Sequence, residues 1–109
     1  MKLISKDNIH EFLTKYNNLH DANYENINYD VKNFSIKATF NGYDYGGEKP
    51  QRVQLSMLFN GVKSFEINEV FDWNFLLGAS VEAKDDMWVY IDNPENPYVS
   101  ILCKEIYFE

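Results

Sequence analysis

Residues 34–41 alternate strictly between apolar and polar side chains. The apolar members are Phe34, Ile36, Ala38 and Phe40, and the polar members are Ser35, Lys37, Thr39 and Asn41. Successive side chains of a β-strand point to opposite faces, so this alternation predicts a strand with one buried face and one solvated face. Residues 27–31 alternate in the same way. A turn at residues 30–33 would join the two segments into an antiparallel hairpin.

A second pair of strands is predicted downstream. The apolar positions of the third strand are Val53, Leu55, Met57 and Phe59. Asn60-Gly61 follows directly, and this dipeptide is typical of tight β-hairpins because both residues tolerate positive φ. Residues 62–67 are therefore expected to return as a fourth strand. Between the two pairs, residues 41–50 are rich in glycine and predict a loop.

The last third of the sequence continues the strand pattern. Residues 81–83 and 87–91 predict two strands joined by a turn at residues 84–86. Residues 93–97 contain two prolines, which predict a turn outside any ladder of hydrogen bonds. Residues 99–108 are apolar on both faces at their centre, which predicts a final strand in the interior of a sheet.

One helix is predicted near the start of the chain. Apolar residues recur there at helical spacing, namely Ile9, Phe12, Leu13 and Tyr16. Ser5 or Asp7 could cap its first turn, and Asn17-Asn18 could end it, since asparagine tolerates left-handed backbone. Residues 69–78 fit neither the helical nor the strand period, so both structures remain open for that segment.

These elements predict an α+β fold in which the N-terminal helix packs on a mostly antiparallel sheet of about six or seven strands. The 109 residues suit a single domain. No stretch approaches the roughly 20 apolar residues that a membrane span needs, and the charged start of the chain does not resemble a secretory signal. A cytoplasmic protein is therefore expected. The lone Cys103 excludes an intramolecular disulfide and is expected to be a buried apolar residue.

Acidic residues are concentrated in one part of the sequence. The net charge is −7, yet residues 1–64 carry seven acids and eight bases, whereas residues 65–109 carry ten acids and two bases. Such a chain repels nucleic acids and anionic membranes, so neither is an expected partner. If the later strands share one side of the fold, that side could attract a basic protein. The alternative is that the charge serves solubility alone.

The residues expected to bind such a partner combine acids with aromatic anchors. They are Glu82, Asp85, Asp86, Asp92 and Glu95, together with Tyr43 and Tyr45 in the glycine-rich loop. Tyrosine is enriched among the residues that dominate binding energy at protein interfaces. The prediction depends on these carboxylates sharing a common surface.

His20-Asp21 is the alternative candidate site. A histidine beside a carboxylate could act as a general base or bind a metal ion. However, the only other histidine is His10 in the predicted helix, so a metal site would lack ligands. A structural role at the end of the helix is the simpler interpretation. No catalytic residue, metal or cofactor is predicted elsewhere.

Several short motifs resemble one group of proteins. They are Leu19-His20-Asp21-Ala22, Ile27-Asn28-Tyr29-Asp30, and Phe59-Asn60-Gly61-Val62 followed by Phe65-Glu66-Ile67. Residues 12–67 resemble small, mostly uncharacterised bacterial proteins with a Leu-His-Asp start and a Phe-x-Gly-Val pattern. Some of these are classed as immunity proteins of polymorphic toxin systems. The resemblance implies a cytoplasmic, non-enzymatic binding protein, and it implies no catalytic role for the His-Asp pair.

The sequence therefore predicts a non-enzymatic acidic binding protein, with neutralisation of a basic toxin as its most specific form. Two alternatives stay open. One is a small enzyme or ligand-binding domain that uses His20 and Asp21. The other is a homodimerisation module in which a sheet edge or face binds a second copy of the chain.

Overall fold

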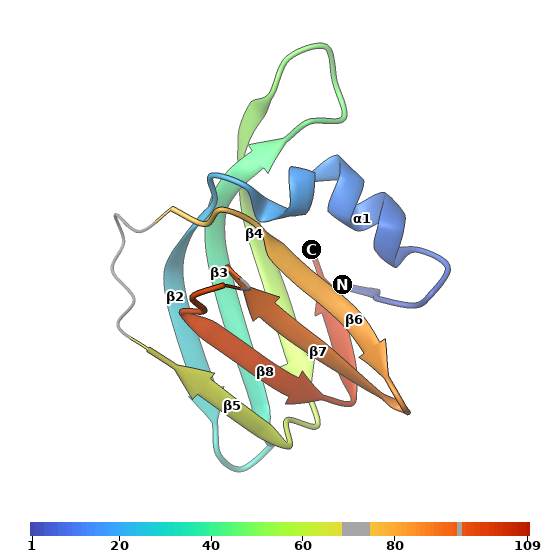
Figure 1. The fold of residues 1–109 in the computed structure, drawn as a ribbon, viewed down its shortest axis with the longest axis vertical. Helices are drawn as coiled ribbons and strands as arrows, with labels where there is room; N and C mark the ends of the chain where they lie inside the picture. The colour runs from blue at the N-terminus through green and yellow to red at the C-terminus, as the bar shows by residue number, and fades with distance from the viewer. Residues whose placement is uncertain (69–74, 94) are drawn as a thin grey trace.

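The strands form two antiparallel sheets that pack face to face (Figure 1). The computed structural model describes residues 1–68, 75–93 and 95–109. The first sheet contains, in spatial order, β1 (Lys2–Leu3), β9 (Glu105–Phe108), β4 (Gln51–Asn60), β3 (Ser35–Asp44) and β2 (Asn23–Asp30). The second sheet contains β5 (Ser64–Ile67), β8 (Val99–Cys103), β7 (Met87–Asp92) and β6 (Ala79–Lys84). The predicted α+β class is confirmed, and the strands are divided between two sheets where one was expected.

The N-terminal helix, α1 (Ile9–Lys15), is confirmed and lies at one end of the sandwich, beside β6 (Figure 1). Phe12 of the helix and Tyr16, which follows it directly, are buried against the core, and the Phe12 ring stacks on Phe108 with centroids 4.0 Å apart. Asn8, rather than Ser5 or Asp7, occupies the capping position. A short 3-10 turn, η1 (Asn17–Leu19), follows with positive φ at both asparagines, which ends the helix as predicted.

Two of the predicted hairpins are present. β2 pairs with β3 through a turn at residues 31–34, and β6 pairs with β7 with Lys84 opposite Met87. Ile36 is fully buried, as the alternation predicts. Phe34 is an exception, because it belongs to the turn with φ 50° and is 59% exposed.

The predicted hairpin at Asn60-Gly61 is wrong. β4 pairs with β3 and β9, whereas β5 pairs with β8 in the other sheet. Gly61 does adopt left-handed backbone, with φ 62°, but it turns the chain from one sheet to the other. A dipeptide that favours positive φ predicts a turn in both cases. It does not predict whether the strand after the turn pairs with β4 or with β8.

The last predicted strand is also divided between the sheets. It breaks at Lys104 into β8 and β9, each of which is interior to its sheet, as expected. The backbone amide of Lys104 donates hydrogen bonds to the carbonyls of Asn60 at 3.0 Å and Gly61 at 3.2 Å. The chain thus crosses between the sheets twice at the same corner.

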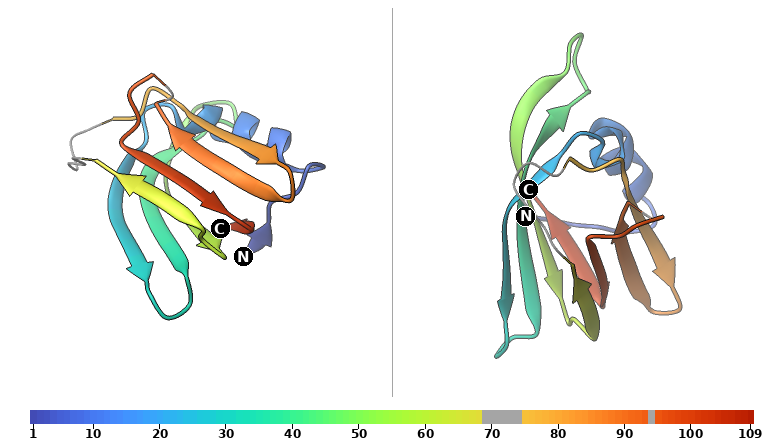
Figure 2. Two further views of the ribbon diagram at one scale, coloured as in Figure 1. Left: turned by 60° about the horizontal axis from the view of Figure 1, so that its bottom comes forward. Right: turned by 60° about the vertical axis from the view of Figure 1, so that its left-hand side comes forward.

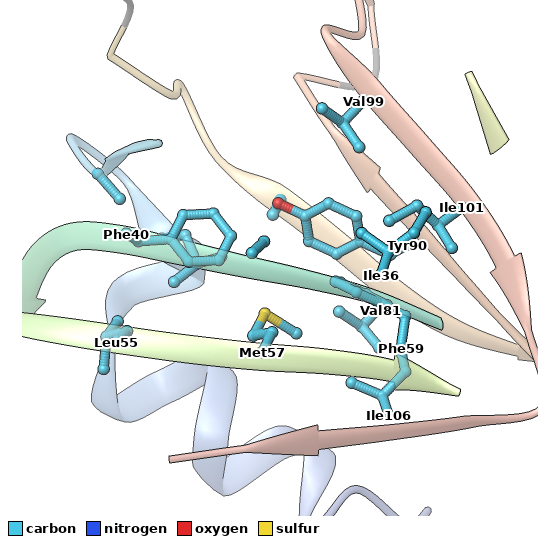
Figure 3. Close-up of a cluster of buried hydrophobic side chains, with 14 of the residues drawn as sticks. Ile36, Phe40, Leu55, Met57, Phe59, Val81, Tyr90, Val99, Ile101 and Ile106 are labelled. Atoms are coloured by element: carbon cyan, nitrogen blue, oxygen red, sulfur yellow. The ribbon is translucent and has the colours of Figure 1, made fainter. Parts of the chain in front are cut away.

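The core lies between the sheets, and the inner side chains of both contribute to it (Figure 3). Phe59 of β4 contacts Tyr90 of β7, with ring centroids 5.1 Å apart and both side chains fully buried. Cys103 is buried as predicted. Among the described residues, no helix has the length and apolar character needed to cross a membrane.

The open question about residues 69–78 is answered only in part. Residues 69–74 lie outside the described residues. Residues 75–78 form no helix or strand, and Leu76 within them is fully buried.

Candidate functional site

Asp92 is buried, so its predicted role as a surface acid is wrong. Its side chain is 0% exposed and lies on the inner face of β7. Its carboxylate accepts hydrogen bonds from the Tyr24 hydroxyl at 2.5 Å and from the backbone amides of Tyr98 at 2.7 Å and Val99 at 3.0 Å. Alternation along β7 could have identified this position, because Tyr90 and Asp92 share one face. Charge alone does not distinguish a buried aspartate from an exposed one.

Asp92 belongs to a buried polar cluster that connects the two sheets. The hydroxyls of Tyr24 on β2 and Tyr90 on β7 lie 2.8 Å apart. Burial raises the pKa of the Asp92 carboxyl, and its three hydrogen bonds oppose that rise. Burial also raises the pKa of both Tyr24 and Tyr90, so each hydroxyl keeps its proton at neutral pH. The cluster satisfies polar groups inside the core and offers no exposed reactive atom.

The other predicted acids are exposed but do not all lie together. Glu82 lies on β6, and Asp85 and Asp86 form the tip of the β6–β7 hairpin. Glu95 lies in the turn after β7, at the opposite end of that strand. Glu105 belongs to β9 in the first sheet. The expectation that the acids of residues 65–109 share one surface is therefore wrong for the set as a whole.

Tyr43 and Tyr45 are distant from Asp85 and Asp86 at the β6–β7 tip. They lie where β3 leads into the projecting β3–β4 loop, at the other end of the long axis from the β6–β7 tip (Figure 1). Both side chains are half-buried, with ring centroids 6.4 Å apart. The amide of Tyr45 donates to the carbonyl of Lys15 at 2.8 Å, which ties this segment to the helix. The structure does not bring these tyrosines to the acidic tip of the β6–β7 hairpin.

His20 and Asp21 do contact each other. His20 Nδ1 lies 3.2 Å from Asp21 Oδ2, and the side chains are 45% and 56% exposed. Asp21 has left-handed backbone, with φ 65°. Neither residue lines the cavity of about 730 Å³ near Tyr98 or the cavity of about 370 Å³ on the second sheet. Within the described ranges, no group of three or more His, Cys, Asp or Glu side chains is placed to hold a metal ion.

The outer face of the second sheet carries a feature that the sequence analysis missed. In register across this sheet, Glu82, Val89, Leu102 and Ser64 form one row, and Ser80, Ile91, Ser100 and Glu66 form the next. The apolar members of this face are Met87, Val89, Ile91 and Leu102, which we call the apolar stripe. All four are partly exposed. The stripe occupies the two interior strands, and each edge strand supplies a glutamate.

The apolar stripe is open to solvent. A shallow cavity of about 370 Å³ lies over it, lined in part by Glu66, Lys84, Val89, Ile91 and Leu102. The outer face is turned toward the viewer in Figure 1, and no helix or strand of the described chain crosses in front of it. Figure 2 shows the same arrangement from the side, with α1 at the end of the sandwich. This face therefore has no covering element within the described residues.

The outer face of the first sheet differs. Its positions on β3 and on most of β4 are polar, whereas Leu58 of β4 lies in one row with Tyr107 and Leu3 at the β1 edge. The polar positions are Ser35, Lys37, Thr39, Asn41, Gln54 and Ser56. The usual outer face of a sandwich is polar in this way, because only the inner faces form the core. The second sheet departs from that rule. Contiguous apolar patches at the surface of a protein are a recurrent mark of binding sites.

The carboxylates around the stripe form no ion pair within the described ranges. The ion pairs found within the described ranges are Lys15–Asp44 and His20–Asp21. Glu66, Glu82, Asp85 and Asp86 take part in neither. Lys84 is the one base among the outward residues of these four strands. The face thus combines an apolar centre with an excess of negative charge.

No protein-family model matches the chain, and no curated protein or solved structure matches it either.

Proposed function

We propose that the protein is a non-enzymatic binding protein whose partner is a basic protein. The observation that carries this proposal is the set of exposed carboxylates on the second sheet, Glu66, Glu82, Asp85 and Asp86, which have no ion-pair partner among the described residues. Unpaired charges of one sign create a field that accelerates the approach of an oppositely charged protein.

The reactive side chains of the described part support a binding role over catalysis. Burial raises the pKa of Cys103 to about 12, so its thiol is protonated and shielded at neutral pH. Asp92 is occupied by three hydrogen bonds. His20 and Asp21 form an exposed pair that lines neither of the two cavities described above. A general base needs a bound substrate within hydrogen-bond reach, and neither member of this pair contributes to the lining of those two cavities.

The same surface makes self-association less favourable than binding a different protein. Two copies that met through the apolar stripe would bring the Glu66 and Glu82 side chains of both copies into one interface. Like charges at an interface cost several kcal/mol. A basic partner would neutralise them. An immunity protein bound to a basic toxin is the specific form of this proposal that the sequence resemblance implies.

The proposal is tested by capture followed by quantitative binding. Immobilised protein is used to isolate a partner, which is identified, purified and titrated at about 0.05 M and about 0.5 M salt. We expect the Kd to rise at least about tenfold over this range. Glu82→Lys should weaken binding, whereas the matched charge reversal Glu48→Lys, in the exposed β3–β4 loop, should not. An affinity that is indifferent to salt and to Glu82→Lys would overturn the proposal.

A further inference from the structure

We infer that the outer face of the second sheet binds an amphipathic, basic α-helix of the partner protein; this inference rests on the function proposed above. The helix would lie along β7 and β8, with its apolar side chains on the apolar stripe. Lysine or arginine residues on both flanks of the helix would face Glu66 on one side and Glu82 on the other.

The width of the face suits a helix. Glu82 on β6 and Glu66 on β5 lie on the two edge strands, three strand steps apart. At about 4.8 Å a step, the edges are separated by roughly 14 Å. An α-helix with its side chains is about 10–12 Å wide. A helix centred between the edges therefore leaves each glutamate beside one of its flanks, within reach of a long basic side chain.

The length of the stripe sets the length of the contact. Met87, Val89 and Ile91 lie at alternate positions of β7, so the stripe runs for roughly 13 Å along that strand. With a helical pitch of 5.4 Å, this distance corresponds to about two turns. The complementary sequence in the partner would carry apolar residues at positions i, i+3, i+4 and i+7, with bases on either side.

The charges select this occupant over others. An acidic or neutral helix would leave Glu66 and Glu82 at the rim of an apolar contact without compensation, which disfavours binding. The stems of lysine or arginine can cover the edges of the apolar stripe while their charged groups reach the carboxylates. Charge and shape therefore point to the same ligand.

The test uses a synthetic peptide of about 18 residues in which leucine forms one helical face and lysine flanks it. A second peptide has the same composition in scrambled order. Both are titrated into protein with labelled valine, leucine and isoleucine methyl groups and observed by NMR. We expect chemical-shift changes centred on Val89, Ile91 and Leu102, and at least about tenfold weaker binding of the scrambled peptide.

Charge variants then examine the two flanks. Glu66→Lys combined with Glu82→Lys should weaken peptide binding at least about tenfold, and Glu48→Lys should leave it within about twofold of the original protein. If the lysine variant does not fold, the milder pair Glu66→Gln and Glu82→Gln should still weaken binding in the same direction. Unchanged binding in the folded variant contradicts the inference.

The remaining outcomes separate this inference from the proposed function. Shift changes centred elsewhere, such as at the cavity lined by Leu77 and Tyr98, would overturn the inference. So would a stripe buried by a second copy, detected as a dimeric mass in sedimentation. In both cases salt-sensitive binding to a captured basic protein would leave the proposed function standing. If no basic protein binds with a salt-sensitive affinity, the proposed function is itself wrong.

Discussion

The Tyr24 hydroxyl donates a hydrogen bond to the Asp92 carboxylate at 2.5 Å, and this contact joins the two sheets inside the core. Tyr24 lies on β2 and Asp92 on β7, 68 positions apart in the chain. The other carboxylate oxygen of Asp92 accepts the amides of Tyr98 and Val99, which fixes the start of β8. One buried acid therefore connects three elements of the fold.

Tyr24→Phe should lower the free energy of unfolding by about 1–3 kcal/mol, because it leaves a buried carboxylate oxygen without its donor. The measurement is urea unfolding followed by circular dichroism. Tyr29→Phe is the matched control, since that side chain is 39% exposed and its hydroxyl has no hydrogen bond in the described structure. We expect the control to change stability by less than about 0.5 kcal/mol. Equal effects of both substitutions would show that the Tyr24 hydrogen bond adds nothing.

Two aspartates should affect stability with opposite dependence on pH. Burial raises the pKa of Asp92, so its contribution to stability is fully present below the unfolded-state pKa and is lost as pH rises through the folded-state pKa. The side chain of Asn33 donates to Asp30 and lowers the pKa of that carboxyl, so its contribution is present above the unfolded-state pKa and is lost as pH falls.

The check is urea unfolding of the original protein, Asp92→Asn and Asp30→Asn between about pH 3 and about pH 7. Relative to Asp92→Asn, the original protein should lose stability as pH rises. Relative to Asp30→Asn, it should lose stability as pH falls. Parallel curves for the original protein and Asp92→Asn would mean that this carboxyl titrates alike in both states.

Cys103 should be unreactive in the folded protein. Burial raises the pKa of its thiol to about 12, and only the thiolate attacks disulfide reagents. At pH 8 we expect labelling to be at least about 100-fold slower than in urea-unfolded protein. Rapid labelling under native conditions would indicate that β8 opens locally far more often than its burial suggests.

Gly61→Ala should cost about 1 kcal/mol of stability, because residue 61 has φ 62° and an added Cβ would lie 3.0 Å from the Lys104 side chain. Gly47→Ala is the control, since the nearest neighbour of its Cβ would be the carbonyl oxygen of Lys49 at 3.9 Å. The difference between their thermal unfolding midpoints measures the effect. Equal midpoints would show that the corner accepts a side chain without strain.

The two faces of the second sheet should tolerate a hydroxyl differently. Val89 belongs to the partly exposed apolar stripe, whereas Val99 is 1% exposed and faces the core. Val99→Thr should cost about 1–3 kcal/mol, because it buries a polar group, and Val89→Thr should cost less than about 1 kcal/mol. Comparable losses, measured by urea unfolding, would indicate that the stripe is covered in the native protein.

Local patterns in the sequence are sufficient for the helix and for two of the hairpins. The spacing of Phe12 and Tyr16 and the alternation around Ile36 depend on nearest neighbours, so they can be recognised without a structure. The division into two sheets could not be recognised. Gly61 requires positive φ whether the chain returns beside β4 or crosses to β8, and the choice depends on contacts with residues about 40 positions away.

The same limit applies to the candidate site. The exposed positions of Glu82, Asp85 and Asp86 were predictable from charge alone. The burial of Asp92 could have been predicted, because Asp92 is two positions after Tyr90 and therefore lies on the same face of the strand. The interpretation based on charge did not use this spacing. Glu66 and Ile91 lie in one row because β5 and β7 both pair with β8. This row could not be predicted from the sequence without knowing the strand order.

The double crossing at Gly61 and Lys104 has a consequence for how the protein is made. β9 follows every other described strand in the chain, yet it lies between β1 and β4. While the ribosome is still adding the residues before it, β1 has no neighbour and one edge of β4 stays unpaired. The first sheet and the corner at Gly61 and Lys104 can therefore form completely only after β9 has been synthesised. Pairing between strands that are far apart in the sequence also slows folding.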